Sequence, residues 1–364
     1  MKAKIFKANI LSWGYRKLRE HYINKTYRKQ GNEGRPKDLE EVVKLGDSRL
    51  LRLHPLFYQF PIPSGISRKL YDLEFPSPLT LSSFKDELEI IGRWMQLGLG
   101  GACIKTVMKD PREGNNRPRL QEVMVNGHSC LINAMGLPGK GVEARIQDLR
   151  NTIQHPPGIF SEGKPIGISI GGSSIEEYRY NFKQLNEFLK NKWGYPYYFE
   201  INGSCPNTPD GQQLGKTPVL LYELLDFARC STQSVIGFKA SPDLPDDHLL
   251  GIASAISHLP RMYINLGNTQ SKTCADVGLS SDAISIGKGG LSGPALYERT
   301  LAMTHLVSRA HIGIPIIATG GVDSAEKVKE LLDAGATLVG MATAVVQDMY
   351  CIPKINYKLK NLGI

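Results

Sequence analysis

Short apolar runs rich in β-branched residues recur from residue 78 onward, and each is followed by a segment with helical periodicity. The apolar runs, which we expect to be strands, span 78–83, 101–107, 166–172, 197–203, 235–241, 261–268, 314–320 and 336–344. The helical segments include 174–190, 218–230, 244–257, 297–310 and 324–334. Near-continuous apolar strands that alternate with helices are typical of a parallel sheet covered by helices.

Eight such units within about 285 residues predict a (β/α)8 barrel, the TIM-barrel architecture, with a doubly wound parallel sheet as the alternative. The pattern does not extend to the start of the chain. We therefore divide the chain into an N-terminal extension, residues 1–70, and a barrel domain, residues 71–364.

The charge of the chain is concentrated in this extension. The whole chain has 44 Lys plus Arg against 35 Asp plus Glu, a formal net charge of +9. Residues 1–37 hold 11 basic and two acidic residues, which accounts for the entire excess. A basic balance can indicate nucleic acid or anionic lipid as a partner. Here that inference applies only to the extension, so we expect no nucleic-acid partner for the barrel.

The extension contains one amphipathic stretch. Four side chains recur at helical spacing on one face: Leu11, Tyr15, Leu18 and Tyr22. Arg16 and Lys17 lie on the other face, and Trp13 also falls on the polar side. Two interpretations stay open: a helix in residues 1–37 that binds a membrane surface, or a solvated, partly disordered basic arm.

Composition limits the class of protein further. With 41% hydrophobic and 22% charged residues the chain is an ordinary globular protein. Its apolar stretches are shorter than the ~18 residues that span a bilayer. The six cysteines form no C-x-x-C pair, so we expect no metal site and a reduced compartment. We expect a cytoplasmic protein, with peripheral attachment at the inner membrane face as the open alternative.

In a (β/α)8 barrel the chemistry lies at the carboxyl ends of the strands. Most residues at these ends carry an amide, a hydroxyl, an ammonium group or a thiol, and the others are glycine or alanine. They are Ser82, Ser83, Lys105, Thr106, Gly171, Gly172, Asn202, Cys205, Asn207, Lys239, Asn268, Thr269, Gly320, Gly321, Ala342 and Thr343. Carboxylate clusters and histidines are missing from this set. Glycosidase and metal-hydrolase chemistry are therefore disfavoured.

Two features of this set point to a ligand. Gly320 and Gly321 follow the seventh strand, next to Ala342 and Thr343 after the eighth, where barrels bind phosphate groups. The alternative is a simple turn between strand and helix. Lys105 and Lys239 end apolar runs, where an unpaired ammonium is costly to bury. Their partner is either an electron-rich cofactor or a structural salt bridge.

Several segments together resemble the dihydroorotate dehydrogenase family. Residues 202–209, Asn-Gly-Ser-Cys-Pro-Asn-Thr-Pro, are similar to the family's catalytic loop. Four other regions follow in the family's order: 101–120, 132–137, 289–293, and 319–323 with 334–344. The resemblance covers about residues 75 to 350. It departs from the family at Gly203, where a branched apolar residue is more usual.

This resemblance implies oxidation of dihydroorotate to orotate with FMN in pyrimidine biosynthesis. Cys205 would be the base that removes a proton from carbon 5 while a hydride leaves carbon 6 for the flavin. The implied substrate-binding residues are Lys105, Asn133, Met135, Gly136, Leu137, Asn202, Asn207, Asn268 and Thr269. The implied FMN-binding residues are Ser82, Ser83, Lys105, Asn202, Lys239, Gly293, Gly320, Gly321, Ala342 and Thr343.

The electron acceptor stays open between quinone and fumarate, with NAD through a partner subunit a further alternative. A cysteine base resembles the soluble members of the family, whereas an N-terminal extension resembles the membrane-associated members that reduce quinone. Residues 50–63, with Leu53, Phe57, Tyr58 and Phe60, either pack on the barrel or line a quinone tunnel. A tRNA-dihydrouridine synthase-like flavoenzyme and an inactive membrane-docking barrel are the alternative functions. We expect a homo-oligomer.

Overall fold

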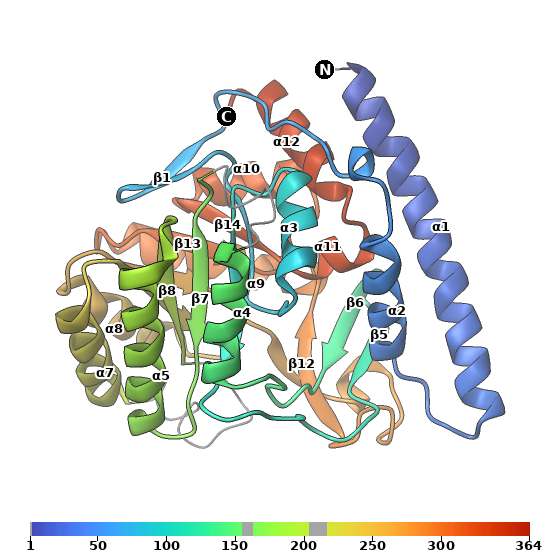
Figure 1. Cartoon of the computed structure of the whole chain (residues 1–364), viewed down its shortest axis with the longest axis horizontal. Coiled ribbons are helices and arrows are strands. Elements are labelled where there is room, and N and C mark those ends of the chain that lie inside the picture. Colours follow the sequence, from blue (N-terminus) through green and yellow to red (C-terminus); the bar gives the residue numbers. More distant parts are fainter. Residues whose placement is uncertain (1, 155–162, 204–216) are drawn as a thin grey trace.

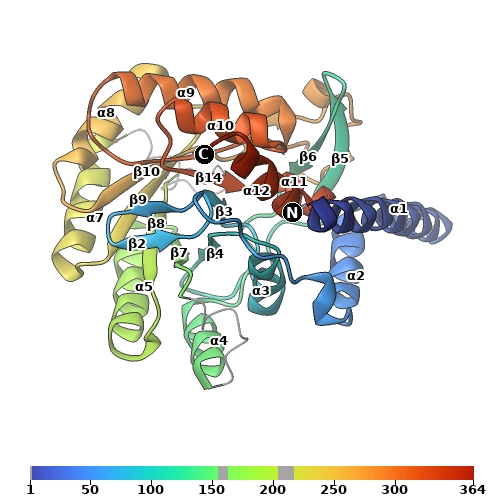
Figure 2. The ribbon, with the colours of Figure 1, turned by 90° about the horizontal axis from the view of Figure 1, so that it is seen from above.

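Eight parallel strands close into a barrel in the computed structural model, which describes residues 2–154, 163–203 and 217–364 (Figures 1 and 2). In barrel order these are β10 (Met262–Leu266), β13 (Ile316–Thr319), β14 (Leu338–Met341), β3 (Leu79–Leu81), β4 (Gly101–Val107), β7 (Ile166–Ile170), β8 (Tyr197–Asn202) and β9 (Val235–Ala240). Each of the eight strands lies within an apolar run identified in the sequence. The predicted barrel is thus confirmed, and the doubly wound sheet is wrong.

Helices cover the outside of the barrel, as Figure 2 shows. They are α3 (Leu88–Gln96), α4 (Val142–Gln154), α5 (Ile175–Phe188), α7 (Pro218–Ser231), α8 (Asp246–Ser257), α9 (Tyr297–Arg309) and α10 (Ala325–Asp333), followed by α11 (Thr343–Gln347) and α12 (Cys351–Asn361). Serine caps begin two of them: Ser174 accepts a hydrogen bond from the Glu177 amide, and Ser324 accepts one from the Lys327 amide. Because helices cover one face and barrel side chains fill the other, strands such as β9 and β10 are buried throughout.

A hairpin closes the amino-terminal end of the barrel. It consists of β1 (Arg68–Leu70) and β2 (Leu73–Phe75). Leu70 and Phe75 pack in one buried cluster with Tyr198 and Tyr263 from the barrel interior. The division of the chain at residue 70 stays a prediction, and this hairpin runs across it.

A second sheet lies over the opposite, carboxyl end. Its order is β11 (Gln270–Thr273), β12 (Lys288–Ser292), β6 (His128–Asn133) and β5 (Leu120–Val125), all antiparallel. These strands belong to the excursions that follow β4 and β10, so they extend the rim of the barrel. The sequence interpretation missed them, although Asn126 and Gly127, both with positive φ, form the Asn-Gly turn typical of a tight hairpin.

The N-terminal extension is a pair of helices on the side of the barrel, α1 (Lys2–Asn32) and α2 (Glu40–Leu50), followed by a short 3-10 helix, η1 (Pro55–Phe57). Figure 1 shows α1 running along the whole molecule. No helix in the described ranges is both long and apolar enough to cross a bilayer.

Polar contacts anchor α1 to the barrel along its length. The Ser12 hydroxyl donates to Asp348 Oδ2 at 2.6 Å, and Arg19 donates two hydrogen bonds to Glu122 at 3.1 and 3.3 Å. Ala8 and Gln30 are fully buried. A solvated or partly disordered arm is therefore the wrong description of residues 2–32.

The predicted apolar face of α1 only partly matches the buried face. Leu11, Tyr15 and Tyr22 pack against buried clusters, whereas Leu18 is 48% exposed. Trp13 is exposed, as its place on the polar side predicts. The most buried positions of α1 are instead small or polar residues, Ala8, Ser12, Thr26 and Gln30.

Candidate active site

One cavity of about 960 Å³ lies at the carboxyl end of the barrel, bordered by α1 and α2. It is lined by every predicted site residue that the structure describes: Ser82, Ser83, Lys105, Asn133, Met135, Gly136, Leu137, Asn202, Lys239, Asn268, Thr269, Gly293, Gly320, Gly321, Ala342 and Thr343. Cys205 and Asn207 lie outside the described residues. A cavity of this size is at the upper end of those that bind small molecules and cofactors.

The glycines at one end of the cavity adopt conformations that other residues avoid. Gly320 and Gly321 have φ values of +140° and +73°, and Gly293 has +117°. A Cβ on Gly321 would lie 2.5 Å from the Tyr297 backbone nitrogen. The side chain of Thr343 joins this end to β12 by a 2.9 Å hydrogen bond with Ser292. These glycines thus let the loops pack closely against Cys130, Tyr297 and Thr300 while they line the cavity.

Two buried hydroxyls at the cavity wall have no hydrogen-bond partner among the described residues. They belong to Ser82 and Thr319, and both residues line the cavity. A Cβ on Gly340 would lie 2.0 Å from Thr319 Oγ1 and 2.9 Å from Ser82 Oγ, so the glycine leaves room for both hydroxyls. Unsatisfied buried polar groups are rare in proteins, and a ligand that carries polar atoms would satisfy these.

The two predicted lysines face the cavity in different states. Lys239, on β9, is buried, and its ammonium donates to Ser83 Oγ at 3.2 Å. Lys105, on β4, is partly buried, and its ammonium makes no ion pair or hydrogen bond within the described ranges. Neither lysine forms a salt bridge with a described residue, so the alternative of a structural salt bridge is not supported. Burial lowers the pKa of Lys105 to about 8, and Glu87 partly opposes that effect.

The sequence interpretation missed a buried carboxylate beneath Lys239. Glu200 precedes Asn202 by two residues on β8 and therefore points into the barrel on the same side. Its carboxylate accepts hydrogen bonds from Asn265 Nδ2 at 2.7 Å, Ser83 Oγ at 3.1 Å, Tyr263 Oη at 3.3 Å and Cys103 Sγ at 3.8 Å. The signal in the sequence was an acid inside an otherwise apolar run. Glu200 connects to Lys239 through the shared Ser83 hydroxyl.

The predicted amides converge from separate elements. Asn202 Nδ2 donates to Thr106 Oγ1 at 2.8 Å, and Thr106 shares a 3.0 Å hydrogen bond with Ser169. Asn133, at the end of β6, donates to the Gly290 carbonyl at 3.2 Å. Asn268 accepts from the Thr269 amide at 2.9 Å. Thr106, for which the sequence predicted no binding role, also lines this part of the cavity.

Gly203, the departure from the family's pattern, has a local physical reason. A Cβ on Gly203 would lie 2.1 Å from the ring of Phe238 on β9. The buried Phe238 ring thus occupies the space that a branched side chain would need. The glycine at the start of the predicted catalytic loop thus makes room for the Phe238 ring.

The part of the cavity next to α1 and α2 is apolar and opens outward. Ile10, Trp13 and Leu18 line it and are 51%, 63% and 48% exposed. Leu53 and Phe57 line it as well, whereas Tyr58 and Phe60 are buried in the core. Part of residues 50–63 thus packs on the barrel, as one interpretation predicted, and part lines the cavity; a quinone tunnel there stays a prediction. The cavity has a polar half within the barrel rim and an apolar half beneath the N-terminal helices.

A closed barrel of parallel strands with a ligand cavity at its carboxyl end defines a (β/α)8-barrel enzyme. The family model described as dihydroorotate dehydrogenase matches residues 66–362, and the chain belongs to this family. The predicted family is therefore confirmed, and the tRNA-dihydrouridine synthase alternative is wrong. The enzymes of this family are oxidoreductases that act on dihydroorotate.

Individual relatives agree with this membership. The chain is 29% identical over 315 residues to a dihydroorotate dehydrogenase (quinone) of Christiangramia forsetii, covering 82% of this chain and 86% of the relative. It is 31% identical over 258 residues to the catalytic subunit of dihydroorotate dehydrogenase B (NAD(+)) of Geobacillus kaustophilus, covering 71% and 77%. A crystal structure of dihydroorotate dehydrogenase from Eimeria tenella in complex with ferulenol matches with a TM-score of 0.72. That match, at 20% identity over 88% of this chain and 91% of the other, supports the fold alone.

Replacing Glu200 by alanine should lower the free energy of unfolding by about 3 kcal/mol, because buried donors such as Asn265 and Tyr263 lose their acceptor. Urea denaturation followed by circular dichroism measures this loss. Glu223→Ala, at an exposed position on α7, is the matched control. Equal unfolding midpoints for the two variants would contradict a structural role for the Glu200 network.

Proposed function

We propose that this dihydroorotate dehydrogenase binds FMN in the polar half of the cavity, uses Cys205 as the base and passes electrons to a quinone in the apolar half. The observation that carries the proposal is the continuity of the two halves in one cavity. A polar, anionic substrate and an apolar acceptor need different surroundings. This cavity offers both within reach of one cofactor.

The described residues fit a flavin mononucleotide. Gly293, Gly320, Gly321, Ala342 and Thr343 would hold its phosphate, because all five line the cavity and four of them follow the seventh and eighth barrel strands, where barrels bind phosphate groups. Ser82, Ser83, Lys105, Asn202 and Lys239 would contact the ring and its polar edge, and the unsatisfied Ser82 hydroxyl supports this placement. When bound, FMN supplies the two-electron acceptor for the reaction.

The amide-rich part of the polar half suits dihydroorotate. Its ring presents alternating N–H and C=O groups, and carboxamides both donate and accept hydrogen bonds. Asn133, Met135, Gly136, Leu137, Asn202, Asn207, Asn268 and Thr269 would contact the ring, and Lys105 would face its carboxylate. The unpaired ammonium of Lys105 within the described ranges supports that last role. A bound anion would stabilise its charged form.

Cys205 would take the proton from carbon 5 of dihydroorotate. It follows Asn202 by three residues, and Asn202 lies at the cavity. A free thiol has a pKa near 8.5 and acts as a base near neutral pH only with help from its surroundings. The hydroxyls of Thr106 and Ser169, joined by a 3.0 Å hydrogen bond next to Asn202, are available for a proton relay.

The apolar half supports quinone as the acceptor. The relative from Christiangramia forsetii is described as a quinone enzyme. Phe6, Ile10 and Trp13 form an exposed stripe on α1. Leu53 and Phe57 lie at the opening beside it, and Leu56, near them in the chain, is exposed as well. Lys7 holds the two segments together through a 2.7 Å hydrogen bond to the Leu56 carbonyl. We call these six apolar residues the apolar rim.

The apolar rim would also place the opening on a membrane surface. Apolar side chains on a basic helix are the features that bind a helix to the plane of a membrane interface. The basic residues of the extension supply attraction to anionic lipid. A quinone could then enter the cavity directly from the lipid. Peripheral attachment and a homo-oligomeric state remain proposals for this chain.

Cys205→Ala should retain bound flavin but lose rapid bleaching of the flavin absorbance by dihydroorotate, because proton removal from carbon 5 is lost. The loss should exceed about a hundredfold in stopped-flow measurements. Cys230→Ala, which removes an exposed cysteine, is the matched control. Bleaching of the Cys205→Ala flavin at the wild-type rate would refute the assignment of the base.

Binding of dihydroorotate should weaken as pH rises through about 8, where the Lys105 ammonium of the ligand-free enzyme loses its proton. The sign follows from the charge: below this pH the lysine is cationic and attracts the substrate carboxylate, and above it the lysine is neutral. Titration of the flavin spectrum in Cys205→Ala measures binding without turnover. Lys105→Met should bind weakly at every pH and lose this dependence. A wild-type profile in Lys105→Met would contradict the assignment.

The double variant Ile10→Glu/Trp13→Glu should lose liposome binding and more than about tenfold of the rate with a long-chain quinone. Reduction of the flavin by dihydroorotate should be unchanged, because the rim lies outside the polar half. Val219→Glu, at a similarly exposed apolar position on α7, is the control. Fumarate and NAD are tested as oxidants in parallel. Faster turnover with either of them than with quinone would overturn the acceptor assignment.

A further inference from the structure

Helix α2 carries two largely buried carboxylates on the face that lines the cavity. Glu40 and Asp47 are seven residues apart, which is two helical turns or about 10 Å along the axis. Glu40 pairs with Arg119, and Asp47 pairs with Lys85. Both cations come from the barrel domain and are mostly buried. The helix of the extension thus supplies a counter-charge for each of two cations at the cavity wall, and Glu87 is a second partner of Lys85 at 3.0 Å.

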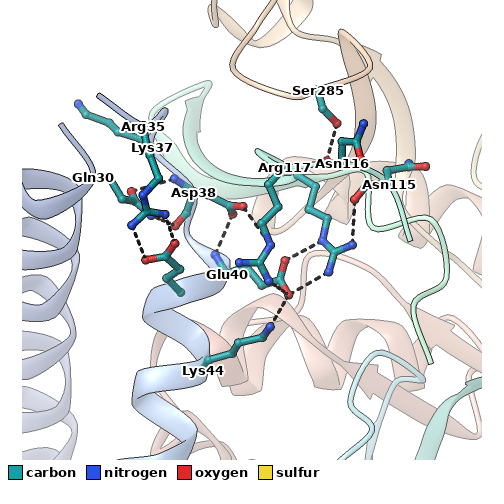
Figure 3. Close-up of polar contacts among 12 residues, drawn as sticks. Gln30, Arg35, Lys37, Asp38, Glu40, Lys44, Asn115, Asn116, Arg117 and Ser285 are labelled. Carbon is teal, nitrogen blue, oxygen red and sulfur yellow. Dashed lines mark hydrogen bonds and ion pairs between the residues drawn. The ribbon is translucent and has the colours of Figure 1, made fainter. Parts of the chain in front are cut away.

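Glu40 is the more heavily bonded of the two acids. Arg119 donates to it twice, from Nε to Oε2 at 2.7 Å and from Nη2 to Oε1 at 3.0 Å. Arg117 Nη2 lies 2.9 Å from Oε1 and Lys44 Nζ lies 3.2 Å from it (Figure 3). Burial acts to raise the pKa of Glu40, but Arg119 and its neighbours outweigh that effect and lower it to about 2. The carboxylate is therefore ionised over the whole physiological range.

Arg119 supports a loop rather than offering a free binding group. Its Nη1 donates to the carbonyls of Glu113 and Asn115 at 2.6 and 2.9 Å. Together with the bonds to Glu40, these contacts occupy the guanidinium. The carbonyl of Arg119 accepts a hydrogen bond from the Ala134 amide at 2.9 Å. The side chain and the backbone of Arg119 thus connect α2 to two segments at the rim.

Asn115 carries this support to the cavity wall. Its amide donates to the Met135 carbonyl at 3.0 Å, and its side-chain Nδ2 donates to the Ala134 carbonyl at 2.9 Å. Gly136 packs so closely that a Cβ there would lie 2.6 Å from the Asn115 nitrogen. Met135 and Gly136 line the cavity where dihydroorotate would bind. Displacement of Arg119 would therefore move the substrate wall.

Three members of these pairs, together with Glu87, affect the charge of Lys105. Glu87 and Lys85 face Lys105 from the segment that leads into α3, Arg119 faces it from the start of β5, and Glu40 faces it from α2. Arg119 and Lys85 lower the pKa of Lys105, whereas Glu87 and Glu40 raise it. Lys85 is also fixed to Lys105 through the backbone, since its carbonyl accepts the Lys105 amide at 2.9 Å.

We infer that Glu40 and Asp47 are positioning residues for dihydroorotate, because they hold Arg119 and Lys85 in place and offset the positive charge of both beside Lys105. The identity of the substrate rests on the proposed function. The inference makes α2 a working part of the polar half of the cavity, in addition to a wall of the apolar half. Neither acid has to touch the substrate to act in this way.

Glu40→Gln and Asp47→Asn in the full-length, flavin-loaded enzyme test this role. Each variant should raise KM for dihydroorotate about tenfold, because the substrate wall and Lys105 are displaced or discharged. The kcat and the KM for a short-chain quinone should stay within about twofold. The alkaline limb of kcat/KM for dihydroorotate should move by about half a pH unit to lower pH, because a cation beside Lys105 has then lost one of its counter-charges. Glu41→Gln, the neighbouring acid that pairs with Arg35, is the matched control.

Glu40→Asp keeps the charge and should return the alkaline limb to its wild-type position. Wild-type KM and an unmoved limb in both amide variants would overturn the inference. An equal loss toward dihydroorotate and quinone with an unmoved limb would also overturn it, because the acids would then be only structural. If Glu40→Gln fails to retain flavin, the same measurements on Asp47→Asn test the inference. A wild-type enzyme whose flavin is not reduced by dihydroorotate refutes the proposed function instead.

Discussion

Closure of the barrel is the constraint on which the rest of the structure depends. A closed sheet of eight parallel strands has no free edge, and its interior is filled by side chains. At the amino-terminal end the filling is apolar and includes the β1–β2 hairpin. Toward the other end the filling becomes polar around Glu200, whose carboxylate links β8 to Cys103 on β4 and to Tyr263 and Asn265 on β10. Among the described residues the cavity lies at the carboxyl rim, so the added elements that shape it attach there.

The added elements do attach there. The antiparallel sheet β11-β12-β6-β5 grows from the excursions after β4 and β10, and it brings Asn133 beside Gly290 at the cavity. Helices α1 and α2 cover the remaining side. The anchors of α1, Ser12 on Asp348 and Arg19 on Glu122, lie after β14 and on β5. The extension is thus fixed to the same end of the barrel that holds the polar half of the cavity.

The repeating strands and the residues at their carboxyl ends could be predicted because both follow from local pattern. The hydrophobic periodicity gives the strands and their lengths, and the barrel topology then places Lys105, Lys239 and Gly320 at one rim. No knowledge of distant contacts is needed. Glu200, the second sheet and the docking of α1 could not be predicted in this way. Each depends on partners far away in sequence, as Arg19 and Glu122 illustrate. The basic charge of the extension likewise did not indicate that Arg19 would pair with Glu122 and anchor α1 to the body.

Helix α2 shows why a buried ion pair belongs between the two halves of the cavity. Apolar contacts alone would hold α2 against the barrel but would tolerate sliding, since they have little directional preference. The Glu40–Arg119 pair fixes the register of α2 by four directed atoms, although such pairs add little net stability against an apolar replacement. Val43 and Leu50, on the same helix, line the apolar half. One helix thus sets the width of the acceptor half and the charge of the substrate half, so the two cannot be shaped independently.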